Sequence, residues 1–131
     1  MGNQDHIILI PWDFTPVAEY ALQHAFKFAE KAKSKKIVLL HIIKSDKEYD
    51  DAYQKLSKIA SDFQGVNRMD IEPIVRKGTI FTTIGDVASE IESELVVMGT
   101  HGLRGMQKLT GSWALKVIVS SKVPFVVVQE P

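Results

Sequence analysis

Short runs of consecutive apolar residues alternate with amphipathic stretches along this chain, and this alternation constrains its fold more than any other feature. The apolar runs are typical of strands that are buried on both faces. The stretches between them carry apolar residues at helical spacing. We expect strands at His6–Ile10, Ile37–Ile43, Asp70–Arg76, Leu95–Met98 and Val123–Val128, and helices at Pro16–Ala32, Tyr49–Gly65, Ile80–Ile91 and Ser112–Ser120, the first and third capped by Thr15 and Thr79.

Strict alternation of strands and helices indicates an α/β fold, namely a doubly wound, five-stranded parallel sheet with helices on both faces. The commonest strand order for this arrangement is 3-2-1-4-5. It leaves the third strand at an edge, where Pro73 fits because proline removes a ladder donor. It also predicts a topological switch between the first and fourth strands, where ligands bind outside the carboxyl ends. The segments Pro11–Asp13 and Gly99–Gly102 follow those two strands.

A glycine-rich segment, Met98 to Ser112, connects the fourth strand to the last helix. Glycine lets the main chain approach an anion and point its N–H groups at it. A helix that begins at Gly111 and Ser112 adds free N–H donors and the positive end of its dipole. The segment therefore predicts a phosphate site, and the alternative is a surface connection that holds no ligand. It contains no Walker-type Gly-Lys-Ser/Thr, and the chain contains no Gly-x-Ser-x-Gly.

The amino-acid composition of the chain argues against some classes of partner. The chain has 131 residues, enough for one domain with a sizeable core, and its 16 Lys and Arg balance its 16 Asp and Glu. We therefore expect neither nucleic acid nor a membrane surface as a partner. Cysteine is absent, no apolar run approaches the ~20 residues of a membrane span, and the histidines show no metal-binding spacing. These features predict a cytoplasmic protein without a metal site of its own.

The chain resembles the universal stress protein family over nearly its whole length, and four segments carry the resemblance. They are the first strand and its turn, Ile8–Thr15; the second strand with its histidine, Val38–Ile43; the start of the third crossover, Arg76–Gly78; and the fourth strand with its glycines, Leu95–Gly102. ATP-binding members carry Gly-x-x-Gly, nine residues, and then Gly-Ser or Gly-Thr. This chain has eight residues, Leu103–Thr110, between its two glycine groups.

The resemblance implies roles at the adenosine end of a nucleotide. Asp13 would accept a hydrogen bond from the adenosine, and Pro11 and Ile42 would line the base pocket. Main-chain groups of Met98 and Gly99 would contact the ribose and the phosphates. Asp13 is also a residue that caps helices, and the two roles are compatible.

At the phosphate end, the resemblance implies that Gly102, Gly111 and Ser112 cradle the phosphates of ATP, or of AMP or ADP, with Mg²⁺ held through them. Arg104 could add charge at a terminal phosphate, which is our own inference. Trp113 stands where the family usually has a small or β-branched residue, so its bulk either crowds the pocket or forms its wall.

Two further aromatic residues have more than one interpretation. His41 lies within an apolar strand, which favours a hydrogen-bonded histidine in the core over a ligand. Trp12 serves either packing or the pocket wall.

We expect a regulatory protein that binds an adenine nucleotide, with at most slow, incidental ATP hydrolysis, because no catalytic base is evident. The alternative is a dimeric stress-response module without nucleotide, favoured by the short loop and Trp113. A flavodoxin-like enzyme ranks lower, since Pro11–Thr15 is not a Ser/Thr-rich phosphate loop. The apolar edge strand Phe125–Val128 predicts a homodimer, which the resemblance also implies. Residues 1–131 would form a single domain, alone or as half of a tandem protein.

Overall fold

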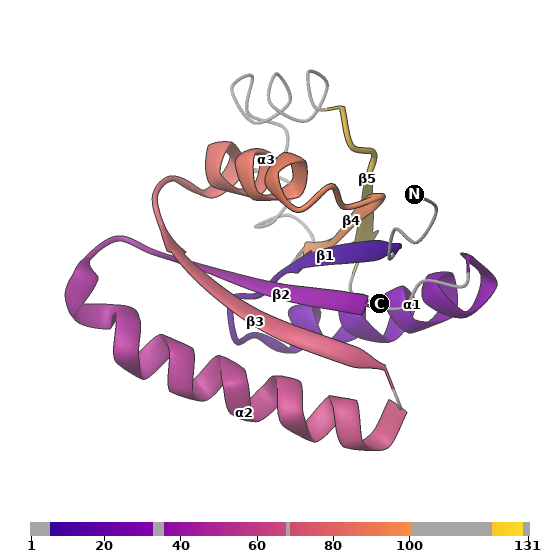
Figure 1. Ribbon diagram of the computed structural model, residues 1–131, viewed down its shortest axis with the longest axis horizontal. Coiled ribbons are helices and arrows are strands. Elements are labelled where there is room, and N and C mark those ends of the chain that lie inside the picture. The colour runs from indigo at the N-terminus through magenta and orange to yellow at the C-terminus, as the bar shows by residue number, and fades with distance from the viewer. Residues whose placement is uncertain (1–5, 33–35, 68, 101–121, 130–131) are drawn as a thin grey trace.

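A computed structural model describes residues 6–32, 36–67, 69–100 and 122–129 (Figure 1). Strands and helices alternate along them, with a short 3-10 helix, η1, before the second helix. The strands are β1 (Ile7–Pro11), β2 (Lys36–Ile43), β3 (Asp70–Lys77), β4 (Leu95–Thr100) and β5 (Phe125–Gln129), and the helices are α1 (Pro16–Ala32), η1 (Asp46–Glu48), α2 (Tyr49–Asn67) and α3 (Ile80–Glu90). The predicted helix Ser112–Ser120 lies outside the described residues.

The strands form one parallel sheet in the order β3-β2-β1-β4-β5, which confirms the predicted α/β topology. β1 lies at the centre between β2 and β4, so its run of apolar residues is covered on both faces. β3 and β5 form the two edges. The topological switch therefore lies between β1 and β4, as predicted.

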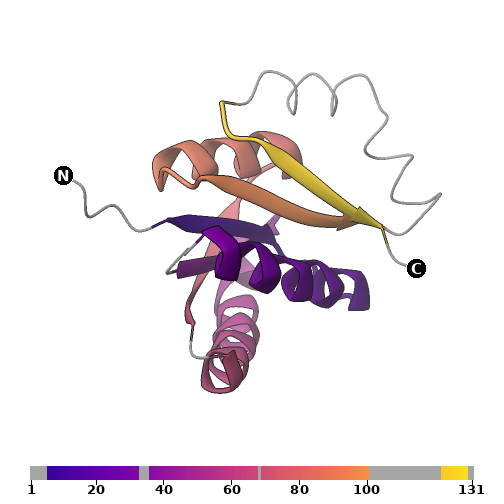
Figure 2. The ribbon, with the colours of Figure 1, turned by 90° about the vertical axis from the view of Figure 1, so that its right-hand side faces the viewer.

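Helices cover both faces of the sheet, and the sheet divides the core into two layers (Figure 2). Successive residues of a strand point to opposite faces. Ile8 and Ile10 of β1 thus pack in the layer beneath α1 and α2, whereas Leu9 packs with Ile84 and Val87 of α3 in the other layer. The continuous apolar runs in the sequence reflect this burial on two sides.

The capping predictions were partly wrong. α1 begins at Pro16 as expected, but the Thr15 hydroxyl donates to the carboxylate of Asp13, while the Thr15 carbonyl accepts from Ala18 at 3.1 Å. Thr79 occupies the N-cap position of α3, yet within the described part of the chain its side chain makes no capping hydrogen bond. Position alone predicted these caps, and the side-chain rotamers decide the hydrogen bonds.

The edge strand β3 is blunted along its first half. Ile43 C=O accepts from Gly78 N–H at 3.1 Å, so alternate residues from Gly78 back along β3 turn their N–H groups toward β2. Ile71 and Pro73 belong to the other set, which faces outward. The outward N–H of Ile71 donates to Gln64 Oε1 at 3.0 Å, and Pro73 has none to offer. α2, which contains Gln64, continues past the predicted end at Gly65 to Asn67.

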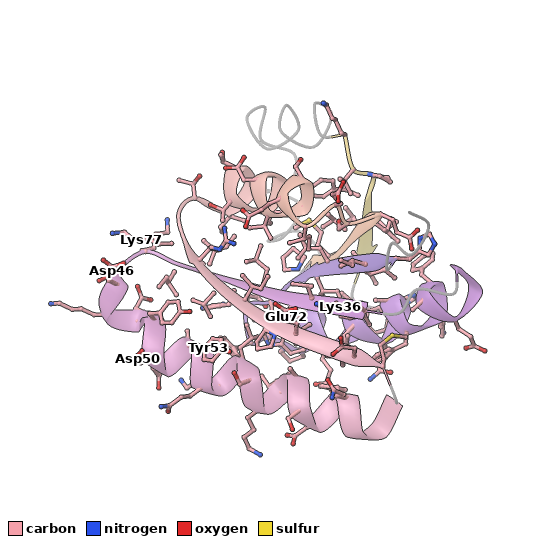
Figure 3. All side chains as sticks on the ribbon, in the orientation of Figure 1. Lys36, Asp46, Asp50, Tyr53, Glu72 and Lys77 are labelled. Atoms are coloured by element: carbon pink, nitrogen blue, oxygen red, sulfur yellow. The ribbon has the colours of Figure 1, made fainter. Side chains whose placement is uncertain are left out.

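Ion pairs join β3 to β2 and to η1 (Figure 3). Glu72 pairs with Lys36 of β2, and Lys77 lies 3.6 Å from Asp46. Arg76 donates to both carboxylate oxygens of Glu90 in α3, at 3.0 and 2.6 Å, and these bonds hold the pKa of Glu90 below its usual value. In the described residues, no helix is both long enough and apolar enough to pass through a membrane.

Candidate functional site

The candidate site lies at the carboxyl edge of the sheet, where β1 and β4 run side by side. β1 pairs with β4 through Ile8 and Leu9, so the residues that end these strands reach the same edge. Pro11 ends β1, and Met98 and Gly99 lie in the last half of β4. Met98 is buried, and Pro11 and Gly99 are half-buried.

Two more predicted residues come to this edge. Ile42 is half-buried near the end of β2 and packs against the layer beneath α3. Asp13 is exposed in the turn that follows β1. The remaining predicted site residues lie outside the described part of the chain: Gly102, Arg104, Gly111, Ser112 and Trp113. The structure therefore gathers the predicted adenosine-binding residues and leaves the phosphate-binding ones undescribed.

The turn from Trp12 to Thr15 is held by hydrogen bonds on both sides. Trp12 N–H donates to Leu40 C=O at 2.7 Å, and Trp12 C=O accepts from His41 Nδ1 at 2.7 Å. Asp13 Oδ1 accepts from Thr15 N–H at 3.2 Å and from the Thr15 hydroxyl. The Asp13 carboxylate thus ties the turn that leads into α1 while it remains exposed.

His41 is the hydrogen-bonded histidine that the sequence predicted. It lies half-buried near the end of β2. A main-chain carbonyl can only accept a hydrogen bond, so the Nδ1 atom that faces Trp12 C=O carries the hydrogen. The bond therefore fixes the tautomer as well as the ring position.

Phe14 has an unusual backbone conformation that sequence reasoning missed. Its φ of 63° lies in the left-handed region, which costs a bulky residue about 1–3 kcal/mol. Phe14 is 38% exposed, and its ring meets the His41 ring edge to face, with the centroids 4.7 Å apart. No residue type or spacing in the sequence signals this conformation, because phenylalanine seldom adopts it.

Trp12 serves packing. Its side chain is only 6% exposed and lies in the core layer beneath α1 and α2, with its ring 6.5 Å from that of Phe63. Its indole Nε1 has no hydrogen-bond partner among the described residues. Trp12 therefore contributes apolar area to the core from a position directly beside Asp13.

Gly99 has a packing role that does not depend on any ligand. A Cβ atom at this position would lie 2.6 Å from the main-chain oxygen of Val17 and 2.8 Å from its Cγ2. Real Cβ atoms do not approach a backbone oxygen so closely, so glycine lets the start of α1 pack onto β4. The same lack of a side chain would let a phosphate approach.

The described residues contain no cluster of three or more His, Asp or Glu that could hold a metal ion.

Comparison with known proteins identifies a family and several solved structures of the same fold. The profile of the universal stress protein family matches residues 6–129. Universal stress protein MJ0577 from Methanocaldococcus jannaschii is 26% identical over 153 aligned positions, which cover 93% of each chain. The solved structure of MJ0577 superposes with a TM-score of 0.77 and covers 98% of each chain.

Two other solved structures share the fold at lower identity. A universal stress protein in complex with cAMP is 19% identical, with a TM-score of 0.75, over 98% of this chain and all of that one. The universal stress protein from Archaeoglobus fulgidus in complex with dAMP is 20% identical, with a TM-score of 0.71, over 95% of this chain and 97% of that one.

Proposed function

The chain belongs to the universal stress protein family, and from this premise we propose that it is a stress-response regulatory protein that binds an adenine nucleotide. The observation that carries the proposal is the arrangement at the topological switch. There, an exposed, hydrogen-bonded Asp13 follows β1, and the neighbouring β4 carries Met98 and Gly99 in its last half. A carboxylate can accept from the hydroxyl or amino groups of adenosine.

Adenine nucleotides are the ligands named for two proteins of the same fold, which hold cAMP and dAMP. These relatives support the ligand class for this chain, and the glycine-rich segment after β4 supports a triphosphate, ATP, with Mg²⁺ held through the phosphates. AMP and ADP share the adenosine that Asp13, Pro11 and Ile42 would contact. Occupancy would act by stabilising one conformation of the glycine-rich segment, with ATP hydrolysis slow and incidental.

A thermal titration tests the proposal. Nucleotide-free protein should melt at a higher temperature as ATP and magnesium are added, because ligand at 100 times its Kd stabilises the folded state by about 2.7 kcal/mol. Asp13→Ala should reduce this shift. Asp62→Ala, which removes an exposed carboxylate on α2, should leave it unchanged. An unchanged melting temperature in millimolar ATP and magnesium would refute nucleotide binding.

Two features of the sequence favour a second candidate, a dimeric stress-response module that binds no nucleotide. The spacer Leu103–Thr110 is one residue shorter than in ATP-binding members, and the bulky Trp113 follows Ser112. A variant with one residue inserted into the spacer separates the two candidates. If the insertion creates an ATP affinity that the parent lacks, the second candidate is correct.

We also propose that the chain forms a homodimer through Phe125–Val128 of β5, in the cytoplasm, where the lack of cysteine suits a reducing compartment. β5 is an edge strand, and Val127 is 44% exposed. The opposite edge, β3, is blunted by Gln64 and Pro73, so strand pairing favours β5.

Light scattering at micromolar concentration should give the mass of a dimer. Val127→Lys should give a monomer, because a charged side chain on an exposed edge opposes strand pairing. Tyr53→Lys, an exposed aromatic residue on α2, is the matched control and should remain dimeric. A wild-type protein with a monomeric mass would contradict the assembly.

A further inference from the structure

His41 contacts the turn before α1 at two points, although it belongs to a different strand. Its Nδ1–H donates to Trp12 C=O at 2.7 Å, and its ring meets the ring of Phe14 at a centroid distance of 4.7 Å and an angle of 61°. Asp13 lies between these two contacts in the sequence. The position of its main chain is therefore set from β2 on either side.

The turn needs this support because Phe14 adopts a left-handed conformation, at a φ of 63°. Such a conformation persists in a bulky residue only where the surroundings impose it, and it often marks a functional site. Two contacts come to this turn from β2: the main-chain oxygen of Leu40 accepts from Trp12 N–H, and the His41 side chain holds both Trp12 C=O and the Phe14 ring.

We propose that His41 is a positioning residue of the nucleotide site, an inference that rests on the proposed function. It touches no ligand. By holding Trp12 C=O and the Phe14 ring, it positions the exposed carboxylate of Asp13, whose Oδ1 accepts from Thr15 N–H, for contact with adenosine.

Two substitutions separate the hydrogen bond from the bulk of the ring. His41→Leu fills the space and removes the donor, whereas His41→Asn keeps an N–H donor at the position of Nδ1. His41→Leu should weaken ATP binding, measured by calorimetry well below the melting temperature, by about tenfold, the equivalent of one hydrogen bond. His41→Asn should restore affinity to within about threefold of wild type. If His41→Leu does not fold, His41→Gln takes its place, because its donor lies one bond farther out.

His24→Leu is the matched control. His24 is a half-buried histidine of α1 whose ring packs against Tyr20 at 4.8 Å, so its loss removes an imidazole away from the turn. Its affinity for ATP should equal that of wild type.

A ligand-free measurement reports on the turn directly. The Thr15 amide, which donates to Asp13 Oδ1, should exchange its hydrogen faster in His41→Leu and at the wild-type rate in His41→Asn. Wild-type ATP affinity in His41→Leu, or a failure of His41→Asn to restore binding, would overturn the positioning role and leave the proposed function standing. A wild-type protein that binds none of ATP, ADP and AMP would overturn both.

Discussion

Trp12→Ala will lower the free energy of unfolding by about 3–5 kcal/mol, the usual cost of truncating a buried aromatic residue to alanine. The side chain is 6% exposed and packs against Phe63 in the layer beneath α1 and α2, so its removal leaves a cavity between helix and sheet. Urea denaturation followed by far-ultraviolet circular dichroism measures the change.

Trp12→Phe is the control for this prediction. It keeps an aromatic ring opposite Phe63 and removes the indole N–H, which has no partner among the described residues. A buried donor without a partner costs about 1–3 kcal/mol, so its removal offsets part of the lost packing. Trp12→Phe should therefore be much more stable than Trp12→Ala. Equal losses in the two variants would mean that the indole nitrogen, and not the packed ring, is what the fold requires.

Gly99→Ala is expected to destabilise the ligand-free protein by about 1–3 kcal/mol, the range for overpacking in a close-packed interior. The added methyl group would lie 2.6 Å from the Val17 main-chain oxygen, and a backbone atom cannot move away as a flexible side chain can. The start of α1 or the end of β4 must therefore shift. Chemical denaturation without nucleotide measures this cost separately from any effect on phosphate binding.

Gly65→Ala provides the matched substitution. It lies in α2, and a Cβ atom there would meet nothing within 4 Å. Alanine is better than glycine in a helix by about 0.5–1 kcal/mol, so this variant should gain stability. If Gly99→Ala folds as stably as wild type but loses its response to ATP, the glycine serves the ligand alone, and the packing explanation is wrong.

Periodicity predicted the elements and their order because buried strands and helices require apolar residues at regular spacings. Ile8, Leu9 and Ile10 must all be apolar when helices cover both faces of β1, and the proline of β3 is tolerated at an edge. The strand order is the commonest one for this alternation, and the position of that proline agreed with it. These are properties of whole segments, and a single sequence carries them.

The details of the site depend on contacts between distant segments, which a single sequence does not carry. The sequence indicated that His41 makes a hydrogen bond, but not that its partner is the carbonyl of Trp12, 29 positions away. It gave no sign of the left-handed Phe14 or of the close approach of Val17 to Gly99. The glycine was expected to serve a phosphate, and the structure adds a packing reason for the same residue.

The scarcity of free N–H donors along the edge strand β3 limits how many copies of the protein can join. Gln64 occupies one outward N–H of β3, and Pro73 supplies none, so a neighbouring chain finds few donors there. If strands pair only at β5, a second molecule occupies the one edge of the first molecule that is open to pairing. Growth then terminates at two, and the α/β sheet is protected from extending into a fibre.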